Sequence, residues 1–167
     1  MSSPSPFPRD PLLDDPLYKL GDAAEAAALD VALLRSWLDR EPIIELGRFD
    51  QAPQGTGKPR LLTLRRIIAI AIAAELVELG IITSRAGRIA TLFTDRELPA
   101  FDTKQSAKPL LVVYPGSELP MKLVPSDGAS RHDQFTAAAF LAVDYAEILR
   151  KVRLRLTRRG WKHLPIG

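Results

Sequence analysis

The sequence predicts an α+β protein, with helices in its N-terminal half and a smaller C-terminal part that combines β-strands with one long helix. Three observations predict this fold class. The first hundred residues contain four helical patterns with capping or helix-breaking residues at their ends. Two short β-prone runs at 110–114 and 121–124 flank a turn and are typical of a β-hairpin. A strongly amphipathic helix is expected over 145–159, with Asp144 as its N-cap.

Two short helices joined by a tight turn are expected at about 20–28 and 30–40. The first is rich in alanine, which suits close packing against a neighbour. Asp30 is a favourable N-cap for the second helix, because its carboxylate can accept hydrogen bonds from free N–H groups of the first turn. Pro42 ends the second helix. A short helix, a turn and a second, capped helix are typical of a helix-turn-helix, whose second helix fits the major groove of DNA.

The spacing of residues in this unit is more specific than its helix pattern. The residues that carry the spacing are Ala24, Ala28, Leu29, Asp30, Leu34, Arg35 and Trp37. This arrangement resembles the MerR-type winged helix-turn-helix DNA-binding family, over residues 18 to 80. Two positions depart from the family pattern. Ala28 stands where the turn usually carries glycine, and Leu62 stands where an aromatic residue is usual.

The resemblance implies that a wing follows the second helix. Arg48 stands at the position of the family's wing arginine, residues 54–57 form a flexible tip, and residues 60–63 lead into the next helix. The two strands of the wing are expected at 43–46 and 60–62.

A third helix is expected at 64–79, with Thr63 as N-cap and Gly80 as the residue that closes it. Its apolar residues lie on more than one face, which is typical of a helix that is buried or shared with a partner. A fourth helix is expected at 84–96.

Three segments follow from these patterns. Residues 1–17 contain prolines throughout, which cannot sustain a helix, and they are expected to form a disordered arm or a segment draped over the body of the protein. Residues 18–98 are expected to form the winged helix-turn-helix domain. Residues 106–160 are expected to form a C-terminal α+β domain for dimerisation or partner binding. Within it, 135–143 fits a strand or the start of a helix, and the cap at position 144 favours the strand.

The candidate DNA contacts come from the second helix and the wing. Arg35 is expected on a phosphate or a base edge, whereas Trp37 has a mainly structural role. Positive charge gathers between positions 48 and 66, with five Lys or Arg against one Asp. The complete set of expected DNA-binding residues is Asp30, Ala32, Arg35, Ser36, Arg40, Arg48, Lys58, Arg60 and Arg65. The alternative is an unrelated helical pair with a surface arginine and a solvated charged loop.

Charge is unevenly distributed along the chain. Residues 1–100 carry 12 Lys and Arg against 14 Asp and Glu, whereas residues 101–167 carry 11 against 6. A slightly acidic N-terminal part disfavours DNA binding, since phosphate neutralisation supplies most of the affinity. The run 150–162 has seven positive residues and no acid. It fits the solvated face of an amphipathic helix, or a second contact with DNA or with an acidic partner.

Several classes of function have no support in the sequence. The chain has no cysteine and only two histidines, His132 and His163, so no metal site, cofactor or catalytic group is expected. Gly57-Lys58 lacks the rest of a P-loop. The longest apolar run, 67–74, is too short to span a bilayer, and the N-terminus lacks a signal-peptide pattern. We expect a cytoplasmic, nucleoid-associated protein that is not an enzyme.

The function expected from these features is sequence-specific binding of double-stranded DNA by a bacterial or phage transcription regulator. A phage or mobile-element accessory factor, excisionase-like or a packaging subunit, is the alternative within DNA binding. A protein-interaction module on the same scaffold is the alternative outside it. Expected partners are double-stranded DNA, RNA polymerase and a second copy of the chain, without a membrane. The dimer is expected to form through the C-terminal half, using the hairpin 110–124, the run 135–143 and the apolar stripe Tyr145, Ile148, Leu149, Val152 and Leu156.

Overall fold

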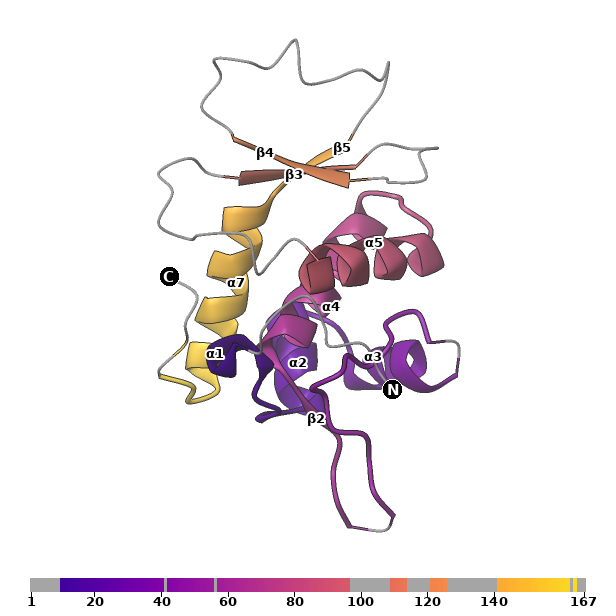
Figure 1. Cartoon of the computed structure of the whole chain (residues 1–167), viewed down its shortest axis with the longest axis vertical. Helices are drawn as coiled ribbons and strands as arrows, with labels where there is room; N and C mark the ends of the chain where they lie inside the picture. The colour runs from indigo at the N-terminus through magenta and orange to yellow at the C-terminus, as the bar shows by residue number, and fades with distance from the viewer. Residues whose placement is uncertain are drawn as a thin grey trace, which may run out of the picture.

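A computed structural model describes residues 10–40, 42–55, 57–96, 109–113, 121–125, 141–162 and 164. These residues form six helices and two small antiparallel sheets, which confirms the α+β class (Figure 1). The helices are α1 (Pro11–Asp14), α2 (Leu20–Ala27), α3 (Val31–Asp39), α4 (Leu64–Glu78), α5 (Thr83–Arg96) and α7 (Tyr145–Arg158). The strands are β1 (Tyr18–Lys19), β2 (Leu61–Leu62), β3 (Pro109–Val113), β4 (Met121–Pro125) and β5 (Leu141–Asp144). Within the described residues, no helix is both long and apolar enough to cross a membrane.

Local capping interactions define the α2–α3 pair. The backbone N–H of Lys19 donates to the Asp22 carboxylate at 3.0 Å, which holds the first turn of α2. Ala28 ends α2 in the left-handed conformation, with φ of 55°. This conformation favours glycine, but alanine adopts it at a modest cost. Asp30 accepts from the N–H groups of Ala32 at 2.7 Å and Leu33 at 3.3 Å, so the expected cap of α3 is confirmed.

Helix α4 lies at the centre of the molecule. Thr63 caps it by accepting from the Arg66 N–H at 3.1 Å, and Gly80 follows it with φ of 91°, as expected from the sequence. Most of its side chains are buried, because α1, α2, α5 and α7 all pack against it (Figure 1). Next to α4, Gly87 of α5 lies against the main chain of Ile43, where an added Cβ would be only 2.1 Å from the carbonyl oxygen. A glycine is therefore required at this crossing.

The C-terminal helix α7 shares the core of the N-terminal helices. Its apolar stripe is buried, and α7 packs against both α2 and α4. The rings of Tyr145 and Phe93 meet edge to face at 5.2 Å, and those of Trp161 and Tyr18 lie 4.5 Å apart. Residues on both sides of the expected 18–98 and 106–160 boundary thus belong to one hydrophobic cluster. The stripe that we expected at a dimer interface is occupied within the chain, so it offers a second copy no apolar surface.

The two sheets differ in how well the sequence predicts them. The order β4-β3-β5 is antiparallel and confirms the hairpin and the strand that precedes α7, although positions 135–140 lie outside the described residues. The other sheet was predicted incorrectly. Leu61–Leu62 pairs with Tyr18–Lys19, not with 43–46, which forms bends and loop instead of a strand.

The prediction for residues 10–17 is also wrong. Pro11–Asp14 forms the short helix α1, in which Asp10 accepts from the Leu12 N–H at 2.9 Å. Proline at the first helical position needs no hydrogen-bond partner for its nitrogen, so it starts a helix readily. Asp14 is buried, which fixes this segment to the body of the protein.

We predict that α7 contributes to stability as much as the N-terminal helices do. Leu156→Ala should lower the free energy of unfolding by about 2–5 kcal/mol, because Leu156 is fully buried and truncation leaves a cavity. Urea denaturation followed by circular dichroism would measure the change as one cooperative transition. Leu154→Ala is the matched control, since Leu154 is 44% exposed and should change the stability little. Equal effects of the two substitutions would contradict the shared core.

Candidate functional site

Helix α3 has one buried side and one exposed side. Leu34, Trp37 and Leu38 are buried and hold the helix on the core. The exposed side carries Val31, Ala32, Leu33, Arg35, Asp39 and Arg40, with Ser36 partly exposed. Because residues four apart lie on one face of a helix, Val31, Arg35 and Asp39 form a single row along it. The expected residues Ala32, Arg35, Ser36 and Arg40 are therefore on the accessible side of α3, and Asp30 caps its first turn.

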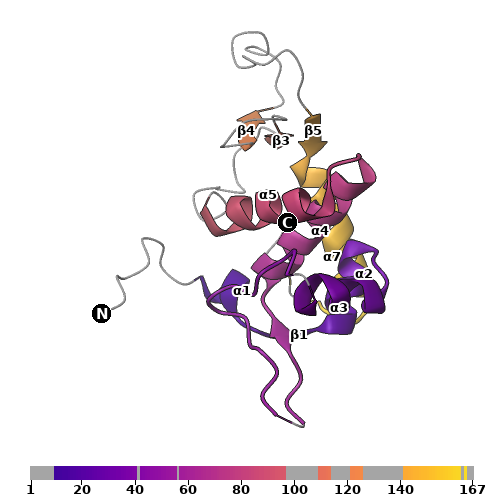
Figure 2. The ribbon, with the colours of Figure 1, turned by 90° about the vertical axis from the view of Figure 1, so that its right-hand side faces the viewer.

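A hairpin projects beside α3. Its arms pair through Gln51 and Leu61, whose backbone groups exchange hydrogen bonds of 2.8 and 3.0 Å, and through a bridge between Gln54 and Lys58. Gly55, with φ of 60°, lies at its turn. Figures 1 and 2 place the hairpin at the end of the molecule opposite to the β4-β3-β5 sheet.

Two of the expected hairpin cations are exposed. Lys58 lies near the tip, and Arg48 precedes the first arm with its guanidinium 5.4 Å from the centre of the Phe49 ring. The contact with Phe49 does not bury Arg48. Both Arg48 and Lys58 are therefore accessible to an anionic partner.

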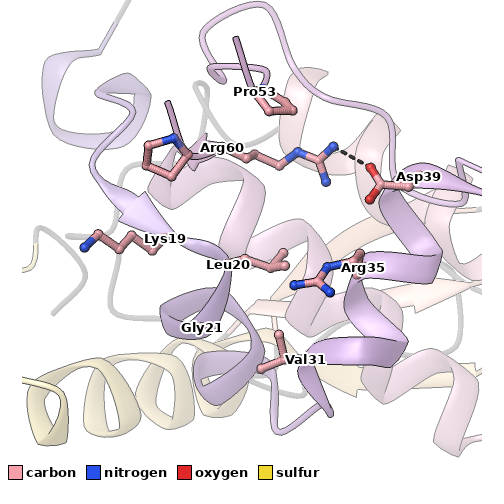
Figure 3. A pocket seen from close by; sticks show the side chains of 9 residues that line it. Lys19, Leu20, Gly21, Val31, Arg35, Asp39, Pro53 and Arg60 are labelled. Carbon is pink, nitrogen blue, oxygen red and sulfur yellow. Dashed lines mark hydrogen bonds and ion pairs between the residues drawn. The ribbon is translucent and has the colours of Figure 1, made fainter. Parts of the chain in front are cut away.

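A groove of about 410 Å³ separates α3 from the start of α2 and the base of the hairpin (Figure 3). Its lining residues are Lys19, Leu20, Gly21, Val31, Arg35, Asp39, Pro53, Pro59 and Arg60. Lys19 is exposed and was not among the residues expected to contact DNA, because the one signal in the sequence is its position directly before the first expected helix. Beside Lys19, burial and the Asp22 carboxylate raise the pKa of the Tyr18 phenol further above neutral pH, so this ring stays uncharged. The groove therefore joins cationic and apolar groups from three segments.

Arg60 is committed to an ion pair with α3. Its Nη2 lies 2.5 Å from Oδ1 of Asp39, and the pair connects the hairpin to the last turn of the helix (Figure 3). Arg60 is mostly buried, whereas Asp39 is more exposed. Arg60 thus neutralises the one carboxylate in the row of Val31 and Arg35, and it fixes the hairpin against α3.

A second, buried ion pair anchors the base of the hairpin. Asp50 accepts hydrogen bonds from the N–H of Gly47 at 2.6 Å and from both the N–H and the hydroxyl of Thr63, at 2.7 and 2.9 Å. It also accepts from Nε of Arg66 at 2.9 Å, and both charged side chains are no more than 2% exposed. A Cβ at Gly47 would lie 2.2 Å from the Arg66 guanidinium, so a larger residue there would displace this side chain from its place beside Asp50. Arg66 also pairs with Asp95 at 3.2 Å.

The structure corrects the role expected for Arg65. Its Nε donates to Asp14 at 2.6 Å, and its Nη1 donates to the carbonyl oxygen of Thr94 at 2.8 Å. The side chain is largely buried, so it cannot reach a duplex that approaches α3. Arg65 has a structural role, since it ties α1 and the end of α5 to α4.

Three of the seven cations in the basic run 150–162 contact other described parts of the chain. Arg155 donates to the carbonyl oxygen of Ala26 at 3.0 Å, and Arg159 pairs with Asp22 at 2.8 Å. Arg150 pairs with Glu147 of the same helix, and Lys151 pairs with Glu75 of α4. The run therefore contributes to the packing of α7 on α2 and α4, in addition to being solvated.

Comparison with models of known protein families finds no match, and comparison with curated proteins finds no similar sequence. Among the described residues, His, Asp and Glu side chains form no group of three that could hold a metal ion. His132 and His163 lie outside those residues.

We predict that Asp50 is essential to the anchor of the hairpin. Asp50→Ala should lower the free energy of unfolding by about 3–5 kcal/mol, because it leaves the Arg66 charge buried without its main partner. Chemical denaturation would measure the loss. Glu45→Ala is a control from the same segment, since Glu45 is exposed and should have little effect. A loss for Asp50→Ala that is no larger than the control's would show that the pair is not structurally important.

Proposed function

We propose that the protein binds double-stranded DNA sequence-specifically, as a winged helix-turn-helix transcription regulator of a bacterium or phage. In this proposal α2 and α3 form the helix-turn-helix, α3 enters the major groove, and the 51–61 hairpin is the wing that follows the phosphate backbone. The observation that carries it is the exposed row of α3, with Arg35 at its centre, beside a projecting hairpin that carries Lys58.

Local electrostatics support this proposal despite the acidic composition of the first hundred residues. The accessible cations on this side are Lys19, Arg35, Arg40, Arg48 and Lys58. Two nearby carboxylates, Asp39 and Asp50, are paired with the arginines at positions 60 and 66, whereas Asp30 caps α3 and Glu45 is exposed. Because the five accessible cations outnumber Asp30 and Glu45, this side has a positive local field, which attracts phosphates.

A protein-interaction module is the second candidate. Val31 and Leu33 are 40% and 45% exposed, and exposed apolar side chains on a helix also suit a protein partner. Gel-shift titration against genomic DNA fragments at two salt concentrations separates the two classes. DNA binding that weakens with salt supports the proposal, and no binding at low salt rejects it. Specific binding to a fragment that lies next to an integration or packaging site would instead favour the accessory-factor alternative.

We predict that Arg35→Ala weakens specific DNA binding by about 1–3 kcal/mol, the cost of losing one charged contact. Fluorescence anisotropy with a selected duplex would measure the dissociation constant. Arg88→Ala is the matched control, because Arg88 is an exposed arginine on another helix, α5, and does not line the groove beside α3. Unchanged affinity in a folded Arg35→Ala variant would contradict the docking of α3.

A second prediction concerns the wing. Lys58→Ala should weaken binding to all duplexes by a similar factor and reduce the slope of log K against log salt by about one unit, since one phosphate contact is lost. Arg60→Ala should reduce the slope less, because Arg60 is already paired with Asp39. A changed sequence preference with an unchanged slope would mean that Lys58 contacts bases.

A further inference from the structure

We infer that the first turn of α3 selects thymine through its C5-methyl group, an inference that rests on the proposed DNA-binding function. The turn consists of Val31, Ala32 and Leu33, and all three side chains are exposed. None of them can donate or accept a hydrogen bond. A base read by this turn must therefore be recognised by apolar contact.

Two backbone N–H groups of the same turn are already engaged. Those of Ala32 and Leu33 donate to the Asp30 carboxylate at 2.7 and 3.3 Å, so neither is free to read a base. The major-groove edge of a base pair presents one apolar group, which is the methyl of thymine. The N-terminal residues of a recognition helix contact base edges. Aliphatic side chains at this end of α3 can therefore pack against the thymine methyl.

The charges around the turn favour a duplex over an apolar protein surface as the occupant. Val31 lines the groove together with Lys19 and Arg35, and Arg35 follows it one helical turn later on the same face (Figure 3). Lys19, which precedes α2, and Arg35, which follows Val31 on α3, therefore lie on two sides of the Val31 side chain. A partner that fits must present a methyl-sized apolar group within a strongly anionic surface, and thymine in B-DNA does so.

The experiment compares thymine with uracil, which lacks only this methyl. The protein first selects duplexes from a randomised pool, and each thymine of the selected site is then replaced singly by deoxyuridine. We expect replacement at one or two positions to weaken binding about fourfold each, the effect of losing one buried methyl-sized group. Other positions should tolerate the replacement.

Variants of α3 assign the effect to a side chain. Val31→Ala should bring the thymine-to-uracil ratio towards one, whereas Val31→Ile should preserve it. Leu154→Ala, an equally exposed aliphatic change on α7, should leave the ratio as in the wild type. Affinity for a selected duplex that is the same with thymine and with uracil, or a ratio that Val31→Ala does not alter, would overturn the inference and leave DNA binding intact. Failure to select any duplex would overturn the proposed function itself.

Discussion

The ion pair of Asp50 and Arg66 determines how the candidate site is assembled. One carboxylate organises the loop before the hairpin, the N-cap residue of α4 and the arginine that reaches α5. Burying two charges costs solvation energy, so such a pair is a poor source of net stability but a strict geometric constraint. The hairpin leaves the body of the protein at this point. Its direction relative to α3 depends first on Asp50 and then on the outer pair of Arg60 and Asp39.

The central position of α4 explains why the C-terminal helix belongs to the same core. A helix that is apolar on most of its faces needs neighbours on every side. Helices α2 and α5 pack against it, and α7, whose apolar stripe is buried, packs against both α4 and α2. The surface that the sequence assigned to a second copy of the chain is thereby used inside one copy. Dimerisation, if it supports DNA recognition, has to use another surface.

Sequence patterns predicted the local interactions well and the long-range ones poorly. The caps at Asp30, Thr63 and Asp144 were predictable, because a cap and the N–H groups that donate to it lie within three residues. The pairing of β1 with β2 joins segments more than 40 residues apart in the sequence, and no local pattern encodes it. The same limit applied to Arg65. The local charge pattern grouped Arg65 with Lys58 as a DNA contact. Arg65 is instead buried, because it pairs with Asp14, which is 51 residues away in the sequence.

The acidic balance of the first hundred residues is therefore a weak argument against an anionic partner. Net charge over a domain counts Asp30, Asp39 and Asp50 as fully as Lys58, yet these carboxylates are held by a helix cap and by two arginines. What a partner meets at close range is the charge that remains accessible, because the field of a paired group falls off steeply. On the α3 side that accessible charge is mainly cationic, and Lys19 and Arg35 lie beside an apolar turn. A duplex satisfies both features at once, through its phosphates and its thymine methyls, whereas an apolar protein surface would satisfy only the second.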